Sequence, residues 1–135
     1  NIKSKINLAI KFRENFRPFA PAIIKHYFDD YFYTDGEKDI PFMEKTKFFK
    51  KNVLKIVPGV VHNDSTGRVQ TVDKTNLLFF NLINNFYKLT DVPILLNTSF
   101  NLNGEPIVES PSDALKTFYS CGLDYLIINN FVINK

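Results

Sequence analysis

The sequence predicts an α/β layer structure, because segments with helical periodicity alternate with short apolar segments typical of strands. Residues 75–89 show the helical pattern, and the apolar run 92–96 follows them. A second helix signal begins at Ser110 and precedes the apolar run 124–132. The chain has 135 residues, 44% hydrophobic and 23% charged, which is the balance of one globular domain. We therefore expect a single α/β domain.

The first helix, at 75–89, is predicted from two neighbouring rows of apolar side chains. These are Leu78, Leu82 and Phe86 in one row and Phe79 and Ile83 in the other. Asp91 and Pro93 end the helix. The run 92–96 is short and apolar, so we expect it as a buried strand.

The second helix has a well-defined start. Ser110 is the expected N-cap, Pro111 occupies the first helical position and Asp113 stands three residues after the cap. Gly122 is expected to end the helix. Residues 124–132, which are mostly apolar and β-branched or aromatic, are expected as one final strand.

The first half of the chain gives weaker signals. We expect an extended segment at 6–12, a proline-bearing turn at 17–21, a helix at 22–33 and a lysine-rich solvated face or loop at 45–55. The segment 55–61 suggests a strand or the entry to a turn, the polar run 62–67 interrupts it, and the segment 69–72 again has strand character. This part of the sequence therefore predicts a strand, a loop and a second strand.

Composition narrows the class of protein. The formal net charge is +3, which fits anionic ligands without requiring nucleic acid. Cys121 is the one cysteine, so we expect no internal disulfide and no Cys-based zinc site, and Cys121 itself as a small buried side chain. We assign no metal-binding residue in this chain. The chain has no signal-peptide pattern and no apolar run of the roughly 18 to 20 residues that span a bilayer, so we expect a cytoplasmic protein without a membrane partner. It opens on Asn1 and has its one methionine at Met43, which indicates a piece of a longer chain.

The arginines are the first candidates for a binding site. Of 17 basic residues only three are arginines, Arg13, Arg17 and Arg68. The planar guanidinium of arginine can form two parallel hydrogen bonds with a phosphate or carboxylate, which the ammonium of lysine cannot do. In an extended segment Lys11 and Arg13 would share a face and form a seat for an anion. Ordinary surface ion pairs are the alternative.

Two polar loops are the other candidates. In residues 62–70, His62 opens the loop, Gly67 would allow a tight turn or a close approach to a ligand, and Arg68 and Gln70 would share a strand face. A plain hairpin loop is the alternative.

The second polar loop, residues 97–105, follows the expected strand 92–96 and offers hydroxyl and amide groups at Thr98, Ser99 and Asn101. Such groups hydrogen-bond phosphate oxygens and amide-like ligands. Asn, Ser and Gly also build loops without any ligand.

Four stretches together resemble one family. KFRENFRPFAPAI, HNDSTGRVQTV, VPILLNTSFNLNGEPIV and SPSDALKTF are similar to the C-terminal domain of O-carbamoyltransferases of the nodulation, cephamycin and tobramycin type, in the same order from about Ile6 to Phe131. The resemblance implies a YrdC-like twisted sheet flanked by helices that binds carbamoyl phosphate and ATP and forms carbamoyl adenylate. It also implies a Kae1-like N-terminal domain of the same parent chain, which holds iron and passes the carbamoyl group to a hydroxyl of a sugar-like or secondary-metabolite acceptor.

The resemblance also implies roles for single residues. It places the family's Lys-x-Arg element on Lys11 and Arg13 and its Ser-x-Asn element on Ser99 and Asn101. The residues expected to act on the phosphates are Lys11, Arg13, Arg17, Arg68 and His62, of which His62 is also a candidate acid or base. The residues expected to bind the substrates are Thr98, Ser99, Asn101 and Gln70.

One departure and two alternatives stand beside this interpretation. Where the family usually has Asp-Gly-Thr or Asp-Gly-Ser, this chain reads Asp64-Ser65-Thr66-Gly67. An RNA-binding module is the alternative of another class, but the scarce arginines and small net charge argue against nucleic acid as a partner. The third possibility is a folded domain that binds nothing until neighbouring residues complete its pocket.

Overall fold

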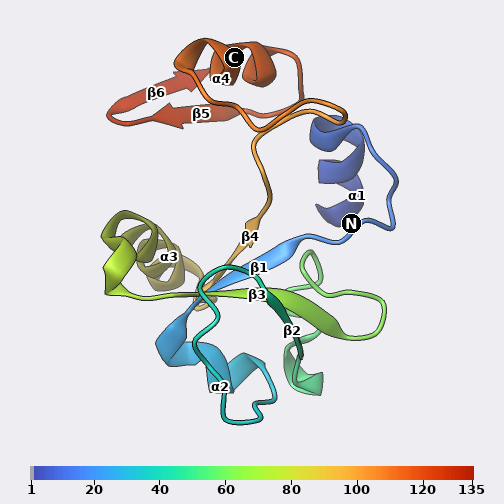
Figure 1. Ribbon diagram of the computed structural model, residues 1–135, viewed down its shortest axis with the longest axis vertical. Helices are drawn as coiled ribbons and strands as arrows, with labels where there is room; N and C mark the ends of the chain where they lie inside the picture. Colours follow the sequence, from blue (N-terminus) through green and yellow to red (C-terminus); the bar gives the residue numbers. More distant parts are fainter. Residues whose placement is uncertain (1) are drawn as a thin grey trace. The chain divides into compact units, whose positions relative to one another are not determined.

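The computed structural model describes residues 2–135, and the chain divides into two compact units, one from Asn1–Arg17 and Ser99–Lys135 and one from Pro18–Thr98 (Figure 1). Within the described residues, helices accompany a mixed four-stranded sheet and a separate two-stranded hairpin. The predicted α/β class is therefore confirmed.

The unit Pro18–Thr98 is built on the four-stranded sheet. Its strands are β1 (Ala20–Ile24), β2 (Lys45–Phe48), β3 (Thr66–Val72) and β4 (Ile94–Asn97), in the order β2-β3-β1-β4. β1 is parallel to β3, and the other two pairs are antiparallel. In the register, Ala22 lies opposite Gln70 on one side and Leu95 on the other.

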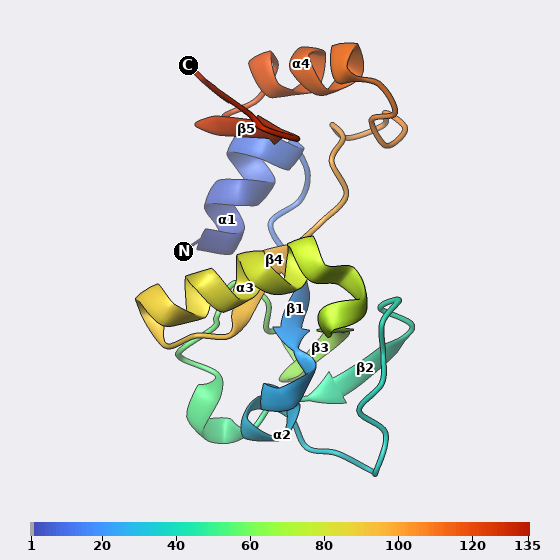
Figure 2. The same cartoon turned by 90° about the vertical axis from the view of Figure 1, so that its left-hand side faces the viewer.

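One face of this sheet is covered by α3 (Leu77–Thr90), which follows the short 3-10 turn η4 (Lys74–Asn76) (Figure 2). Ile83 is fully buried against Ala22, Ile24 and Val72. The helix expected at 75–89 and the strand expected at 92–96 are confirmed, apart from one or two residues at their ends. The row of Leu78, Leu82 and Phe86 faces solvent, with Leu78 86% exposed.

Buried aromatic rings form a second core in the same unit. η2 (Lys25–Tyr27) leads from β1 into α2 (Phe28–Tyr31). The ring of Phe32 lies with its centroid 5.1 Å from that of Phe28 and 4.2 Å from that of Phe49. The helix expected at 22–33 is thus wrong in its first part. Every residue of β1 is buried, and a fully buried strand has the same continuous apolar pattern as a buried helix. The turn expected at 17–21 is also wrong at its end, because Pro21 lies inside β1.

The lysine-rich segment begins with the strand β2, in which three of four residues are exposed, so the solvated face is confirmed and the loop is not. β2 pairs with β3, and the side chain of Lys47 is buried, at 7% exposure, because it pairs with Asp35. The segment 55–61, expected as a strand or the entry to a turn, forms turns after η3 (Lys51–Val53). The strand alternative is therefore wrong, and the antiparallel partner of β3 is β2.

The other unit joins the two ends of the chain. It contains α1 (Ile2–Ile6), the π-helical turn η1 (Asn7–Lys11), α4 (Pro111–Tyr119), β5 (Tyr125–Ile128) and β6 (Phe131–Asn134). α4 packs on the β5–β6 hairpin through Ala114, Phe118 and Leu126 (Figure 1). The predicted capping box of Ser110 and Asp113 is confirmed.

Two expectations fail in this unit. Residues 124–132 form a hairpin instead of one strand, because the chain turns at Asn129, which has a left-handed backbone with φ 52°. The segment expected to be extended at 6–12 is helical through Lys11. Ile6 and Ile10 are four residues apart, a spacing that also fits a helix.

Candidate functional site

The ammonium of Lys11 lies at the centre of the first cluster. Lys11 ends η1 and is 4% exposed. Its Nζ donates hydrogen bonds to the carbonyl oxygen of Ser99 (2.9 Å), the carbonyl oxygen of Asn101 (2.8 Å) and Oδ1 of Asn101 (2.7 Å). An ammonium has three N–H donors, so the loop 99–101 occupies all of them.

The same loop is held by its own side chains. Ser99 Oγ donates to Asn101 Oδ1 at 2.7 Å, and Asn101 Nδ2 donates to the Glu105 carbonyl at 2.7 Å. Both ends of the Asn101 amide are thus occupied. The Ser99 side chain remains exposed, and its hydroxyl oxygen keeps lone pairs that can accept a hydrogen bond.

Asn7, which the sequence interpretation missed, organises the second half of this cluster. Its amide is fully buried. Oδ1 accepts a hydrogen bond from Arg13 Nε at 2.8 Å, and Nδ2 donates to the carbonyls of Arg17 (3.1 Å) and Asn15 (3.4 Å). The Asn7 carbonyl also accepts from the Arg13 amide at 3.0 Å. Asn7 therefore fixes the turn that carries both arginines.

Lys11 and Arg13 come together by a different route from the one expected. Phe12, between them, has a left-handed backbone with φ 47° and ψ 49°, so the two side chains do not share the face of a strand. The chain turns there instead. A non-glycine residue in this conformation is uncommon and is held by its surroundings.

The segment 11–17 carries more positive than negative charge. Burial lowers the pKa of Lys11, and the charge of Arg13 lowers it further. Burial also lowers the pKa of Arg13, and the charge of Arg17 adds to the effect. Arg17 pairs with Glu14 at 3.3 Å, but both side chains are about half exposed, so this pair screens little. The positive charge of Arg13 is therefore repelled by those of both Lys11 and Arg17.

The residues that follow α4 contact η1. The amide of Gly122 donates to the Ala9 carbonyl at 2.7 Å. A Cβ on Gly122 would lie 2.9 Å from that oxygen, so the close approach requires glycine. Cys121 is buried beside it, as expected for a small apolar side chain.

The loop 62–67 belongs to the other unit and is stabilised internally. Asp64 Oδ1 accepts hydrogen bonds from the Thr66 hydroxyl (2.7 Å) and amide (3.0 Å), which lowers the pKa of Asp64. The Thr66 hydroxyl lies 3.2 Å from His62 Nδ1. Gly67 does not give a ligand access, because the site of its Cβ is 2.6 Å from the Phe49 ring.

The remaining candidates lie on or beside the sheet of that unit. Arg68 is exposed on β3, two residues before Gln70 on the same face. Gln70 Nε2 donates to the Pro41 carbonyl at 3.0 Å, and Gln70 Oε1 accepts from Asn97 Nδ2 at 2.8 Å. Thr98 follows β4 and is exposed.

The structure thus divides the predicted site residues between two groups. Lys11, Arg13, Arg17, Ser99 and Asn101 belong to one compact unit, and His62, Arg68, Gln70 and Thr98 belong to the other. Among residues 2–135 no group of three or more His, Cys, Asp or Glu side chains could hold a metal ion. In the same range no helix is long and apolar enough to cross a membrane.

Comparison with known proteins identifies the family. The family model described as "Carbamoyltransferase C-terminus" matches residues 1–135. The chain belongs to this family. The predicted family resemblance is confirmed.

The relatives of this carbamoyltransferase C-terminus are much longer proteins. The chain is 42% identical over 135 residues to "Nodulation protein NolO" of Bradyrhizobium diazoefficiens, covering 98% of this chain and 25% of the relative. It is 41% identical over 135 residues to "Nodulation protein NolNO" of Sinorhizobium fredii, covering 98% of this chain and 20% of the relative. An uncharacterized protein of Methanocaldococcus jannaschii is 41% identical over 134 residues, covering 98% of this chain and 26% of the relative. The chain therefore spans about a quarter of the length of these relatives.

The geometry also shows which signal could have revealed Asn7 in this carbamoyltransferase domain. Asn7 interrupts the apolar sequence Ile6-Asn7-Leu8 and stands four residues before Lys11. A helix places residues i and i+4 on one face, and both side chains are buried here. Two polar residues on one face of an otherwise apolar segment indicate a buried polar network.

Proposed function

We propose that this domain binds carbamoyl phosphate and ATP and catalyses the formation of carbamoyl adenylate within an O-carbamoyltransferase. The observation that supports it best is the uncompensated charge of Lys11. Its three hydrogen-bond partners are neutral oxygens, and no ion pair joins it to a carboxylate among residues 2–135. A buried cation of this kind is stabilised by an anion.

The neighbouring arginines extend this positive region. Arg13 and Arg17 follow Lys11 within six residues, on a turn fixed by Asn7. A guanidinium offers a fork of N–H donors that matches phosphate oxygens. Because Lys11 has its own donors occupied by the loop, it contributes through its charge, and the arginines are the direct phosphate ligands in this proposal.

The proposed reaction needs these charges at a defined step. Water first cleaves the carbamoyl phosphate and releases phosphate and carbamate. An oxygen of the carbamate then attacks the α-phosphorus of ATP, the bond to the β-phosphate breaks and pyrophosphate leaves. Negative charge develops on the phosphate oxygens in this second step, and fixed cations stabilise it. The exposed Ser99 hydroxyl accepts a hydrogen bond from the carbamoyl amide.

The second group of candidates completes the proposal. Arg68 is a candidate ligand of phosphate oxygens within the unit Pro18–Thr98, and His62, Gln70 and Thr98 of the same unit are further candidates for substrate binding in a YrdC-like fold. Transfer to an acceptor hydroxyl would take place in the remainder of the parent chain, where the iron-containing domain is expected. The relatives, four to five times as long as this chain by the shares they have in common with it, support such a companion domain.

Calorimetric titration of the 135-residue chain with ATP and carbamoyl phosphate tests the proposal. We expect saturable binding of both and release of pyrophosphate when they are combined. Arg13→Ala should reduce the rate of pyrophosphate release on the order of 100-fold, because it removes one well-placed cation. Lys55→Ala removes an exposed lysine far from this segment in the sequence and serves as the matched control.

Two results would contradict the proposal. One is a folded chain, by circular dichroism, that binds neither compound at millimolar concentration. The other is binding of single-stranded RNA that weakens steeply with salt while ATP has no effect, since that dependence is the signature of phosphate-backbone binding by an RNA-binding module.

A further inference from the structure

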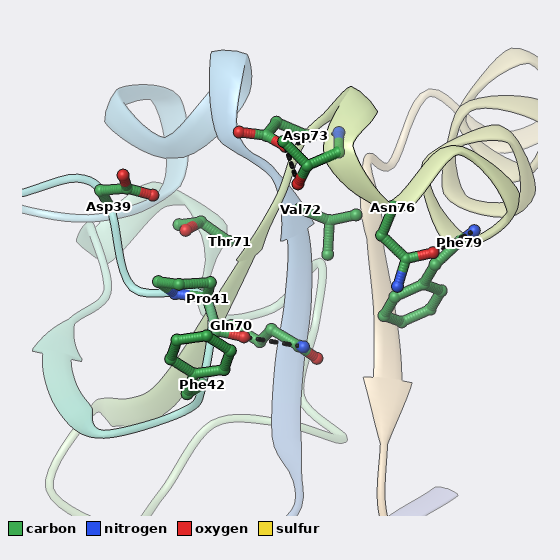
Figure 3. A pocket seen from close by; sticks show the side chains of 10 residues that line it. Asp39, Pro41, Phe42, Gln70, Thr71, Val72, Asp73, Asn76 and Phe79 are labelled. Carbon is green, nitrogen blue, oxygen red and sulfur yellow. Dashed lines mark hydrogen bonds between the residues drawn. The ribbon is translucent and has the colours of Figure 1, made fainter.

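A pocket lies at the end of β3, within the unit Pro18–Thr98, and Gln70 is the one residue of its lining that is also a candidate of the proposed function. Its volume is about 380 Å³, within the range of small-molecule sites. Figure 3 shows its walls: the segment 39–42 on one side, the start of α3 on the other and the end of β3 between them. Ten residues line it: Asp39, Pro41, Phe42, Gln70, Thr71, Val72, Asp73, Thr75, Asn76 and Phe79.

The wall 39–42 is held in place by hydrogen bonds to β3. Ile40 and Thr71 exchange two hydrogen bonds, from the Ile40 amide to Thr71 Oγ1 (2.8 Å) and from the Thr71 amide to the Ile40 carbonyl (2.9 Å). Gln70 binds the Pro41 carbonyl at 3.0 Å. The pocket is therefore formed before any ligand arrives.

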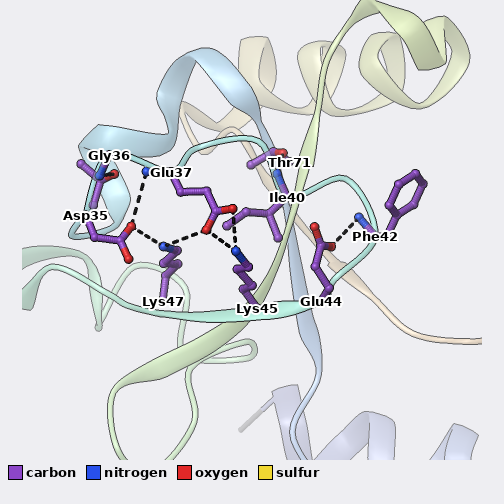
Figure 4. Close-up of polar contacts among 10 residues, drawn as sticks. Asp35, Gly36, Glu37, Ile40, Phe42, Glu44, Lys45, Lys47 and Thr71 are labelled. Atoms are coloured by element: carbon purple, nitrogen blue, oxygen red, sulfur yellow. Dashed lines mark hydrogen bonds and ion pairs between the residues drawn. The ribbon is translucent and has the colours of Figure 1, made fainter.

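Two ion pairs bind residues 35–37, which precede this wall, to β2. Lys47 Nζ lies 2.6 Å from Asp35 Oδ1, and Lys45 Nζ lies 2.6 Å from Glu37 Oε1 (Figure 4). Lys47 is the buried member of this network and lies within ion-pair distance of both Asp35 and Glu37. The segment 35–44 is thus attached to β2 through Asp35 and Glu37 and to β3 through Ile40 and Pro41.

Phe42 is presented at the rim of the pocket. Its side chain is 83% exposed, although it is a large apolar ring. The turn that displays it is specific: Met43 has a left-handed backbone with φ 57°, and the Phe42 amide donates to Glu44 Oε2 at 3.0 Å. An exposed aromatic ring held by a constrained turn at a pocket mouth is suited to stacking on a ligand.

The polar groups of the pocket determine the class of ligand. Asp73 Oδ1 accepts from the hydroxyl and amide of Thr75, which lowers the pKa of Asp73 and keeps it ionised at neutral pH. Asp73 Oδ2 and Asn76 Nδ2 make no hydrogen bond to the residues described, so an acceptor and a donor remain for a ligand. None of the lining residues is basic, which disfavours phosphate.

We propose that this pocket binds a hydroxyl-bearing sugar ring, with Asp73 and Asn76 hydrogen-bonding adjacent hydroxyls and Phe42 covering the apolar face of the ring. The ring can come from the ribose of a nucleoside or from a hexose-type sugar, because both offer adjacent hydroxyls beside a C–H face. The proposal goes beyond the proposed function, since Phe42, Asp73 and Asn76, which carry it, have no part in that function, and Gln70 is the one lining residue common to both.

The test is a titration of the uniformly 15N-labelled 135-residue chain, followed by NMR, with adenosine and, separately, with methyl glucoside. We expect at least one of them to bind saturably and to shift the amide signals of Phe42, Asp73 and Asn76. Saturation by adenosine alone assigns the site to a nucleoside, and saturation by methyl glucoside alone assigns it to a hexose. Binding in this pocket is read from the amide signals of Phe42, Asp73 and Asn76, whereas the proposed function is read from pyrophosphate release, so failure here and failure of the proposed function are distinguishable.

Matched variants identify the contacts. Phe42→Ala should weaken binding about tenfold through the lost ring contact, whereas Phe48→Ala, which removes another exposed phenylalanine, should not. Asp73→Asn keeps an N-cap oxygen for Thr75 and removes the charge, and it should also weaken binding about tenfold. Asp91→Asn, at the other end of α3, is its control.

The proposal is overturned if neither probe shifts these amides, or if both pocket variants bind like the unmodified chain. Cyclohexylamine, a cation without hydroxyls, provides a further arm. If it binds as tightly as the better sugar probe, the carboxylates are recognising charge and not hydroxyl groups.

Discussion

Asn7 Oδ1 accepts a hydrogen bond from Arg13 Nε at 2.8 Å, and this contact links a fully buried amide to an arginine of the proposed anion site. The amide of the same side chain also binds the carbonyls of Asn15 and Arg17. One buried residue thus orients the guanidinium and holds the backbone of the turn around it. Such a network is rigid when all its members are satisfied and costly when one is removed.

Asn7→Ala should therefore destabilise the domain and weaken anion binding together. Loss of the amide leaves buried partners unsatisfied, and we expect the free energy of unfolding to fall by about 1 to 3 kcal/mol. Urea denaturation measures this change. Asn15→Ala is the control, because Asn15 takes part through its backbone carbonyl and its side chain is exposed. Equal stability of the two variants would show that Asn7 does not organise the turn.

Gly122→Ala should destabilise the domain although it adds a single methyl group. The new Cβ would lie 2.9 Å from the Ala9 carbonyl and 3.2 Å from the Ala9 Cβ. Relief requires η1 to move away from the end of α4, which we expect to cost about 1 to 3 kcal/mol as overpacking does elsewhere. Thermal unfolding beside Ser120→Ala, an exposed neighbour, checks the effect. An unchanged melting temperature would mean that this contact is not close in solution.

Local patterns predicted α3, α4 and β4, because each of these elements carries its own signal. Ser110, Pro111 and Asp113 define the start of α4 through bonds made within four residues. The row Phe79 and Ile83 defines the buried side of α3. Signals of this kind do not depend on distant parts of the chain.

Features that depend on tertiary context could not be predicted in this way. β1 pairs with a strand on each edge and all its residues are buried, and its apolar run fits a helix equally well until its partners are known. Similarly, the pairing of Lys11 with Ser99 and Asn101 joins positions 88 and 90 residues apart. The family resemblance pointed to these three residues, but it gave neither the donors that Lys11 uses nor the role of Asn7.

The two apolar rows of α3 should respond differently to truncation. Ile83 is fully buried, and Ile83→Ala should lower the free energy of unfolding by about 2 to 5 kcal/mol. Leu78 is 86% exposed, so Leu78→Ala on the same helix should change it by less than about 0.5 kcal/mol. Chemical denaturation of the 135-residue chain compares them directly. A large loss for Leu78→Ala would show that this row is covered in the isolated chain.

The lowered pKa of Lys11 predicts a pH dependence of stability with a definite sign. Burial and Arg13 hold this pKa below its ordinary value of 10.5 in the folded chain. Between the lowered pKa and 10.5 the unfolded chain binds more protons than the folded one, so the free energy of unfolding rises with pH across that window. Below the window the folded chain carries the whole cost of the buried charge.

Lys11→Met isolates this contribution. The difference in the free energy of unfolding between the unmodified chain and the variant, measured at successive alkaline pH values, should rise through the window in favour of the unmodified chain. Groups common to both proteins, such as Tyr31 with its raised pKa, cancel in the difference. An anion beside the ammonium favours its charged form and raises the pKa, so inorganic phosphate should flatten the rise. If the difference in the free energy of unfolding does not depend on pH, the ammonium of Lys11 is not buried. If phosphate does not change the pH dependence of this difference, Lys11 is not part of the proposed anion site.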